Sequence, residues 1–251
     1  MTPAHLLEAS QWDTFWVPRD VTVTARPELL LLGCDRPMAY LNVVLRARGP
    51  VAARLAEVLE LQGWRHTRWM VTDTSDPAPV ERGLAKAGWT PGGLHEVRSL
   101  RVSDWSRAPA VAAVPVDDLR RLQDCIDVSN AAFGSHHKPD PDDLAEELAA
   151  CTEGARVHRF VAYVDGRPAA SGGLTAFPHL GFGLLWAGAT HPDLRGRGAY
   201  TAVLHARIER ARTLGLGRVG LYALETTSAP IVARMGFAHG GTMRFWERPK
   251  E

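Results

Sequence analysis

The sequence of 251 residues lacks several features that mark secreted, membrane-spanning or metal-binding proteins. It has three cysteines, Cys34, Cys125 and Cys151, which lie far apart and do not have the spacing of metal ligands. We therefore expect small core residues in a reducing cytoplasm, and no metal. No apolar run approaches the about 18 residues that a spanning helix needs, and residues 1–10 do not resemble a secretory signal.

An excess of charge of one sign is also missing. The chain has 29 basic and 28 acidic residues, which gives a net charge of +1, and the two kinds are interleaved. Nucleic-acid-binding proteins normally have a basic excess, so we expect no nucleic-acid partner and no membrane partner. The composition, with 45% hydrophobic and 23% charged residues, is that of an ordinary globular protein long enough for two small domains.

A linker is predicted near Ala108, because residues 103–115 contain two prolines, small residues and little periodicity. This places a first domain at residues 1–107 and a second at residues 108–251.

The two halves also resemble each other. Residues 68–89 and residues 218–237 each contain a β-rich run, a turn with Thr, Ser and Pro, a short helix, and a Gly followed by an aromatic residue. Gly suits the end of a helix, where a positive φ is common. The repeat predicts two copies of one architecture.

Short β-like runs alternate with amphipathic stretches in the second half. The patterns predict strands at residues 110–114, 157–163, 168–176, 181–190, 218–223 and 242–246. They predict helices at residues 117–128, 140–150, 199–214 and 229–234. Asp165-Gly166 is a strong hairpin signal. The run 181–190 is apolar throughout, which favours a central strand.

The helix predicted at residues 199–214 has one apolar face. Leu204, Ile208 and Ala211 recur at helical spacing and are expected to face the sheet. Arg207 and Arg210 are expected to point elsewhere.

The segment before this helix has the chemistry of an anion site. It reads T-H-P-D-L-R-G-R-G-A-Y-T over residues 190–201. Gly196 and Gly198 allow a sharp turn and a close approach to a ligand. The first turn of a helix has unpaired N–H groups and a partial positive charge, and a phosphate satisfies both. Arg195 and Arg197 add positive charge, as a nucleotide-containing cofactor requires.

Two nucleotide-binding patterns, G-x-x-x-x-G-K-[ST] and G-x-G-x-x-G with a downstream acid, are absent. The segment instead resembles [Q/R]-x-x-G-x-[G/A], the signature of the GNAT superfamily of acyl-CoA-dependent N-acyltransferases. Arg195 and Gly198 match this signature, while Tyr200 stands where the family has Gly or Ala and adds bulk there. Residues 229–237, A-P-I-V-A-R-M-G-F, resemble the family segment A-x-x-x-Y-x-x-x-G-F.

The resemblance implies an α/β fold, which some schemes class as α+β, with two GNAT-like domains. Each would have a central mixed, mostly antiparallel sheet flanked by helices. Acetyl-CoA, or another acyl-CoA, would be the co-substrate, and an amine would attack the thioester directly in a ternary complex. The implied cofactor-binding residues are Ala189, Thr190, Arg195, Gly196, Arg197, Gly198, Ala199 and Tyr200. The first two of these would offer backbone N–H groups to the cofactor arm and the oxyanion.

The sequence indicates the catalytic residues less clearly than it indicates the cofactor loop. The family acid is often a Tyr four residues before the Gly of the G-F pair, and that residue is Val232 here. Tyr222 is a candidate for the acid, and Glu225, just past the same predicted strand, is a candidate for the base. Three histidines are alternatives for the base because His titrates near neutral pH: His136, His137 and His191.

The first half has a corresponding strand-like run at residues 39–45 and a helix at residues 51–62, but lacks the signature. Pro50, near the helix start, has no N–H to offer a phosphate. We therefore expect a degenerate copy that keeps the fold and binds no cofactor. It resembles the amino-terminal copy of tandem GNAT proteins, and this resemblance implies that it forms a wall of the acceptor cleft.

Two functions remain open at this point. The chain is an N-acetyltransferase with one active site, or a non-catalytic acyl-CoA-binding regulatory protein. The sequence does not distinguish a small-molecule acceptor from a peptide amine, nor a monomer from a homodimer, and it does not set the length of the acyl chain.

Overall fold

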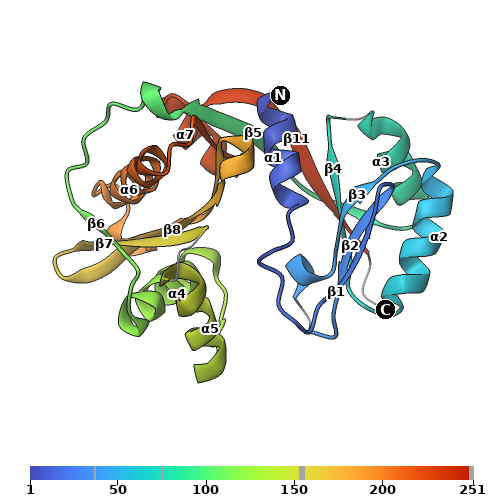
Figure 1. The fold of residues 1–251 in the computed structure, drawn as a ribbon, viewed down its shortest axis with the longest axis horizontal. Coiled ribbons are helices and arrows are strands. Elements are labelled where there is room, and N and C mark those ends of the chain that lie inside the picture. The colour runs from blue at the N-terminus through green and yellow to red at the C-terminus, as the bar shows by residue number, and fades with distance from the viewer. Residues whose placement is uncertain (37, 75, 153–155, 249–251) are drawn as a thin grey trace. The chain divides into compact units, whose positions relative to one another are not determined.

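The computed structural model describes residues 1–36, 38–74, 76–152 and 156–248. Figure 1 shows helices packed against sheets in two parts of the chain. These parts are compact units, one of Met1–Arg98 with Tyr222–Glu251 and the other of Ser99–Leu221. Each unit contains a mixed, mostly antiparallel sheet flanked by helices, so the predicted fold class is confirmed.

The first unit has the strand order β1-β2-β3-β4-β11-β5. Its strands are β1 (Thr22–Arg26), β2 (Leu29–Gly33), β3 (Val43–Ala47), β4 (Arg68–Thr72), β11 (Ala238–Glu247) and most of β5 (Thr90–Arg101). Its helices are α1 (Pro3–Gln11), α2 (Val51–Gln62), α3 (Pro77–Lys86) and α7 (Ser228–Arg234). Strands β3 and β4 are parallel, whereas β1–β2, β2–β3 and β4–β11 are antiparallel.

Strand β2 shows that apolar side chains cover both faces of this sheet. Its residues Leu29 to Leu32 are all buried, although successive side chains of a strand point to opposite faces. Leu30 and Leu32 pack in one apolar cluster with Val21. Leu29 packs in a second cluster with residues of helices α2 and α3. The run of four leucines therefore lies between two layers of apolar side chains.

The end of the chain lies in the first unit and not with the rest of the predicted second domain. Strand β11 pairs antiparallel with β4, from Met243 opposite Thr72 to Glu247 opposite Arg68. The boundary predicted near Ala108 therefore differs from the division of the structure into compact units, which assigns α7 and β11 to the first unit. The sequence repeat marks which elements occur but contains no signal for which strand pairs with which.

The strand predicted at residues 39–45 begins later than expected. Residues Ala39–Leu41 form a short 3-10 helix, and β3 begins at Val43. Between them, the Asn42 side chain accepts from the Cys34 N–H at 2.9 Å and donates to the Arg36 carbonyl at 2.9 Å. These side-chain bonds compete with a regular strand and bend the backbone before β3.

The second unit has the strand order β10-β9-β8-β7-β6. Its strands are β6 (Ala113–Pro115), β7 (Val157–Val164), β8 (Arg167–Phe177), β9 (Phe182–Thr190) and part of β10 (Arg218–Leu224). Its helices are α4 (Leu119–Phe133), α5 (Pro141–Thr152) and α6 (Ala199–Thr213). These elements lie within a few residues of the predicted ones. The hairpin at Asp165-Gly166 is confirmed, with φ of 50° and 74°, both positive as a tight hairpin turn requires.

Helices cover the two faces of this sheet, α6 on one and α4 with α5 on the other (Figure 1). Alternation along β7 shows the two faces. Phe160 and Ala162 pack against residues of α6, whereas Val161 packs with Leu122 and Cys125 of α4. The core of the second unit therefore has two layers, and the sheet lies between them.

His158 on β7 is a buried histidine that should make folding pH-dependent. Burial, together with the positive charge of Arg210, lowers its pKa from 6.5 to about 4. The unfolded chain then binds the proton more readily than the folded chain between these values, so stability is lost as the pH falls from 6.5 toward 4. We expect the parent to lose about 2 kcal/mol of unfolding free energy between about pH 7.5 and about pH 5 through this group.

Urea unfolding at the two pH values measures this loss. The variant His158→Leu removes the titrating group and retains every other one. Its unfolding free energy should therefore fall by about 2 kcal/mol less than that of the parent over the same pH range. An equal pH dependence in parent and variant would contradict the assignment to His158.

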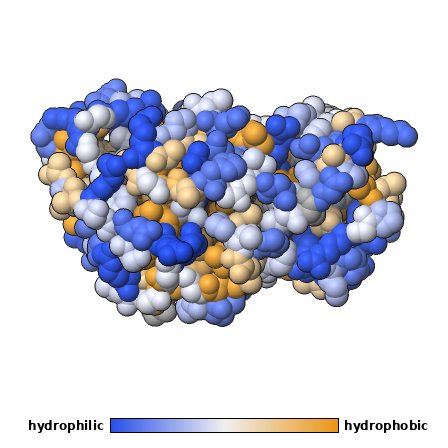
Figure 2. All heavy atoms as spheres, turned by 90° about the horizontal axis from the view of Figure 1, so that it is seen from above, coloured by the Kyte–Doolittle hydropathy of each residue, from blue (hydrophilic) through white to orange (hydrophobic). Residues whose placement is uncertain are grey.

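Figure 2 shows hydrophilic residues over most of the face drawn, with hydrophobic residues in small groups between them. Cys34 and Cys125 are buried, as predicted, and Cys151 is partly exposed. In the described part of the chain, no helix is both long enough and apolar enough to cross a membrane.

Candidate active site

Strand β9 has a bulge in its second half. Ser171 of β8 pairs with Ala189, but Gly173 pairs with Trp186, so Ala187 and Gly188 together oppose a single residue of β8. Ala187 has a φ of 46°, which is rare for a residue with a side chain. Such a bulge bends the strand and leaves backbone groups without a partner. Both bulge residues are exposed to solvent.

The bulge follows the point where β9 leaves β10. The two strands are parallel and pair over only three residues of each, the last pair being Gly220 with Leu184. Strand β9 then continues from Leu185 to Thr190 without pairing to β10. An open strand edge of this kind can bind an extended ligand through backbone hydrogen bonds.

Thr190 directs its backbone groups to this open edge. The His191 N–H donates to the Ala169 carbonyl at 2.8 Å, so the pair of these residues is hydrogen-bonded. Residues that oppose each other in an antiparallel ladder alternate between bonded and non-bonded pairs. The next pair, Thr190 with Ala170, is therefore non-bonded, and both main-chain groups of Thr190 point away from β8. The same alternation turns the Ala189 N–H toward β8, so Thr190 is the better donor of the two that the sequence suggests.

The loop after β9 presents a helix start that no side chain caps. Leu194 is buried and anchors the loop, whereas Gly196 is exposed. Gly198 is the N-cap of α6, with a φ of 82° and no capping side chain. The N–H groups of the first turn thus lack a side-chain acceptor, which is the condition for binding an anion there.

The two arginines of the loop differ in their partners. Arg197 forms an ion pair of 2.8 Å with Asp165, and both side chains are exposed. Arg195 is exposed and forms no ion pair or side-chain hydrogen bond with any residue that the structure describes. Arg195 is therefore the one of the two whose donors are available to an anion.

Arg207 is the largest departure from the sequence prediction for α6. It was expected to point away from the sheet, yet it is 1% exposed. Its Nη1 lies 3.3 Å from the Gly173 carbonyl and 3.4 Å from the Trp186 carbonyl. These contacts link α6 to β8 and to the strand segment before the bulge. The prediction was wrong because a buried arginine has no sequence signature when its partners are backbone carbonyls.

Tyr200 lies beside Arg207 under the bulge. A Cβ added to Gly188 would lie 3.2 Å from the Tyr200 ring and 3.4 Å from Nη2 of Arg207. The Tyr200 side chain therefore fills space between α6 and β9. At the position where the GNAT signature has Gly or Ala, the larger Tyr200 side chain is thus accommodated next to Gly188.

The predicted catalytic residues belong to the other unit. Tyr222 and Glu225 fall in the first compact unit, whereas all eight predicted cofactor residues fall in the second. Glu225 is exposed, and its N–H donates to the Leu94 carbonyl at 3.0 Å. Their catalytic roles stay predictions.

The histidine alternatives lie in the second unit. Nδ1 of His191 accepts from the Asp193 N–H at 3.3 Å, which leaves the proton of a neutral ring on Nε2. His136 and His137 are exposed in the connection between α4 and α5.

Tyr222→Phe should leave acyl transfer within tenfold of the parent. The Tyr222 hydroxyl is buried and has no hydrogen-bond partner among the described residues. Burial raises the pKa of Tyr222, and the Glu8 and Asp73 carboxylates raise it further, which makes it a poor proton donor. Removing an unpaired buried hydroxyl should leave the unfolding free energy unchanged or raise it by about 1 kcal/mol. Steady-state rates and urea unfolding measure the two effects, and a hundredfold loss of turnover would assign the acid to Tyr222.

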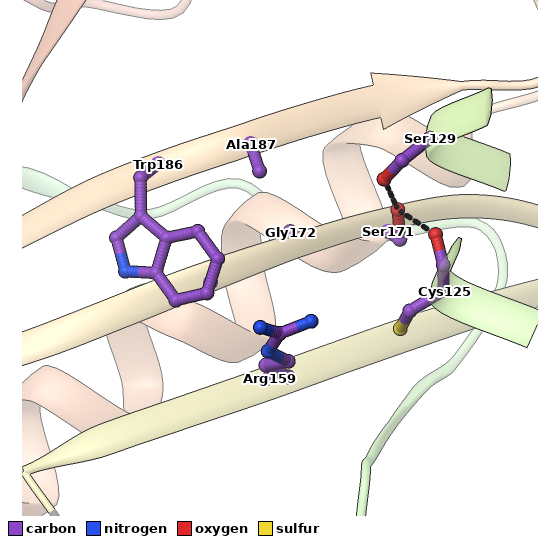
Figure 3. Close-up of a pocket in the computed structure, with 8 residues that line it drawn as sticks. Cys125, Ser129, Arg159, Ser171, Gly172, Trp186 and Ala187 are labelled. Atoms are coloured by element: carbon purple, nitrogen blue, oxygen red, sulfur yellow. Dashed lines mark hydrogen bonds between the residues drawn. The ribbon is translucent and has the colours of Figure 1, made fainter. Parts of the chain in front are cut away.

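A small pocket opens beside the bulge on the side of the sheet that α4 covers (Figure 3). Its empty volume is about 190 Å³, including space open to solvent. Its lining comes from α4, β7, β8 and β9, and consists of Cys125, Ser129, Arg159, Ser171, Gly172, Gly173, Trp186 and Ala187. Gly173 lacks a side chain where the Trp186 ring lies, and a Cβ there would overlap the ring. Among the described residues, no group of three or more His, Cys, Asp or Glu side chains could hold a metal ion.

The comparisons with known proteins fit this geometry. The Acetyltransferase (GNAT) family matches residues 122–237, which include the open strand β9, the loop and α6. The match covers somewhat less than half of the chain, so it is a likeness of this segment to the GNAT family. This match supports acyl transfer from acyl-CoA as the general class of reaction. No curated protein matches the chain.

Solved structures share the GNAT fold over nearly the whole chain. A GCN5-related N-acetyltransferase from Kribbella flavida has 17% identity and a TM-score of 0.76, covering 99% of this chain and 96% of its own. One from Sphaerobacter thermophilus has 14% identity and a TM-score of 0.61, with coverage of 95% and 83%. A tandem GNAT protein from the clavulanic acid biosynthesis pathway has 16% identity and a TM-score of 0.60, with coverage of 94% and 85%. At these identities the likeness concerns the fold alone.

Proposed function

We propose that the chain is an N-acetyltransferase that transfers an acetyl group from acetyl-CoA to an amine, small or peptidic. One observation carries the proposal. Strand β9 leaves β10 after Leu184, directs both main-chain groups of Thr190 to the open edge, and leads directly to an uncapped helix start at Gly198. The pantetheine arm of coenzyme A is an extended chain with amide groups that leads to a pyrophosphate. The amides can pair with the open edge, and the pyrophosphate can accept from the N–H groups of the helix start.

Each part of the cofactor would meet a different part of the second unit. The pyrophosphate would accept hydrogen bonds from the first turn of α6 at Ala199 and Tyr200, with Arg195 adding charge. The amide groups of the pantetheine arm would pair with Thr190 as a strand pairs with an edge. The thioester would then lie toward the bulge at Ala187 and Gly188, where β9 exposes its backbone.

The reaction needs only the two substrates and a base. The neutral amine nitrogen attacks the thioester carbon, and the carbonyl electron pair moves to oxygen, where backbone N–H groups can stabilise the oxyanion. When the carbonyl re-forms, the C–S bond breaks and the thiolate of coenzyme A leaves. The base takes one proton from the nitrogen, and Glu225 is the predicted residue for this role. A thiolate is a good leaving group, so the hydrocarbon side chain of Val232 is compatible with turnover.

The first unit is proposed to be a degenerate copy that binds no cofactor. Strand β3 is followed by α2, as β9 is followed by α6, and β3 pairs with β4 over only two residues of each, Val43 and Val44 on β3. Pro50 is the N-cap of α2 and has no N–H, and the segment before it, residues 46–50, has one glycine and lacks the signature that residues 195–198 match. We therefore propose a tandem arrangement with one cofactor site, and a location in the cytoplasm stays a prediction.

The alternative is an acyl-CoA-binding regulatory protein without turnover, which the unassigned acid and base favour. Release of free thiol from acetyl-CoA, measured with a panel of amines, separates the two. Amine-dependent release with one CoA bound per chain supports the transferase. Tight binding of acetyl-CoA without release for any amine would instead support the regulatory protein.

A further inference from the structure

We infer that the pocket beside the bulge binds a carboxylate carried by one of the two substrates. The inference rests on the proposed acyl transfer, because the pocket matters through its position next to the reacting groups. Ala187, the bulge residue with positive φ, lines the pocket. A ligand in the pocket would therefore lie against the strand segment along which the thioester is proposed to bind.

The polar groups of this pocket are mainly hydrogen-bond donors. Arg159 contributes a guanidinium, and Ser129 and Ser171 contribute hydroxyls. None of the eight lining residues is an Asp or Glu. A pocket that offers a cation and hydroxyls without a carboxylate selects a ligand group that accepts hydrogen bonds and carries negative charge.

The two hydroxyls are only loosely bound by the protein (Figure 3). Ser171 Oγ lies 3.4 Å from the Cys125 carbonyl, and the Ser129 and Ser171 hydroxyls are 3.5 Å apart. Hydroxyl hydrogen bonds are usually about 2.7–2.8 Å long, so these contacts are weak. Both hydroxyls can therefore turn toward a ligand oxygen at little cost.

Arg159 is held in place while part of it stays available. Its Nη2 pairs with Glu147 at 3.0 Å, and its guanidinium lies 5.0 Å from the centre of the Trp186 ring. Its Nε is buried and makes no hydrogen bond to a described residue, and its side chain is 21% exposed. Glu147 does not line the pocket, so it fixes the arginine from outside.

The size of the pocket limits what carries the carboxylate. The pocket is small, and its volume of about 190 Å³ includes space open to solvent, so everything but the carboxylate has to extend through the open side. The amine of an α-amino acid is two bonds from its carboxyl carbon, so a carboxylate in the pocket would hold that amine near the bulge. A dicarboxylic acyl group on coenzyme A would present the same chemistry from the other substrate.

The test uses matched pairs of amines that differ only by a carboxylate, such as phenylalanine with 2-phenylethylamine, each measured with acetyl-CoA. A second arm compares acetyl-CoA with succinyl-CoA and malonyl-CoA for one amine. In the parent, the carboxylated member of one arm should have a kcat/KM about tenfold higher, mainly through a lower KM. A preference in the amine arm identifies the acceptor as the source, and a preference in the donor arm identifies the acyl group.

Variants connect the preference to the pocket. Arg159→Met should reduce the preference to near one while the carboxylate-free reaction continues, and Arg159→Lys should restore part of it. Ser129→Ala should reduce it about threefold, which gives a second readout if Arg159→Met folds poorly. Glu147→Gln is the matched control: the Gln amide oxygen can still accept a hydrogen bond from Arg159, and the nearby negative charge is removed, so the preference should be kept or rise.

A binding measurement separates this inference from the proposed function. Calorimetric titration of the CoA-loaded protein with N-acetylphenylalanine and with N-acetyl-2-phenylethylamine, and of the CoA-free protein with succinyl-CoA and acetyl-CoA, requires no turnover. Tighter binding of the carboxylated ligand in either pair, lost in Arg159→Met, supports the inference even if no amine is acylated, an outcome that would count against the transferase alone. Equal binding within both pairs, or a preference that Arg159→Met retains, would overturn it.

Discussion

Thr190→Pro should lower kcat/KM for acetyl-CoA about tenfold to a hundredfold while the protein stays folded. The substitution removes the one N–H that the ladder pattern turns to the open edge of β9. Without this N–H, a carbonyl of the pantetheine arm loses its hydrogen-bond partner, which costs about 1–3 kcal/mol, or about tenfold to a hundredfold. The fold should tolerate the proline because this N–H does not bond to β8, and proline is accepted on strands where the N–H faces outward.

Thr190→Val is the matched control for this prediction. It keeps the backbone N–H, removes only the hydroxyl and retains the β-branched shape, so its kcat/KM should stay within about threefold of the parent. Circular dichroism and urea unfolding establish that both variants are folded before rates are compared. Equal rates for the proline and valine variants would show that the Thr190 backbone does not contact the cofactor.

Gly198→Val should weaken CoA binding at least thirtyfold, or about 2 kcal/mol. Gly198 is the N-cap of α6 with a φ of 82°, and among the described residues an added Cβ would approach only the Cβ of Ala110 within 4 Å, at 3.6 Å. A valine would project branched carbons from the loop that is proposed to bind the pyrophosphate. It would also favour a negative φ, which turns the first N–H groups of the helix away from the anion.

Gly215→Val separates this effect from backbone strain. Gly215 follows the other end of α6, with a φ of 70° and nothing near an added Cβ. Both variants therefore introduce the same residue at a positive φ, and both should lose a similar amount of stability. Calorimetric titration should show weak CoA binding only for Gly198→Val. If the two variants bind CoA equally well, the proposed cofactor loop is misplaced.

The elements of the second unit could be predicted from sequence because local signals agree with tertiary packing there. Helix α6 shows this agreement: Leu204, Ile208 and Ala211 recur at helical spacing, and all three are buried. The turn at Asp165-Gly166 has the positive φ angles that its sequence favours. The turn before α6 could be predicted for a similar reason, since Gly196 and Gly198 both have the positive φ that Gly permits, while the cofactor role of this loop stays a prediction.

Three features could not be predicted because they depend on contacts between distant segments. The bulge at Ala187-Gly188 arises from the pairing of β9 with β8, and the pair A-G in an apolar run was its only local signal. The sequence predicts a surface position for Arg207, because it contains no signal for the backbone carbonyls that bind this side chain in the folded protein. The donors of the pocket come from α4, β7 and β8, so no spacing rule connects them.

The pairing of β11 with β4 has a consequence for how the protein is synthesised. The two strands of this pair, Arg68–Thr72 and Ala238–Glu247, are separated by more than half of the chain. All of Ser99–Leu221 is therefore synthesised before β11 becomes available to pair with β4 in the first unit. Until then, one edge of β4 exposes unpaired backbone groups, which are the groups through which nascent chains aggregate. Folding of the first unit is thus completed only after Ser99–Leu221 has been made, even though most of its residues are made first.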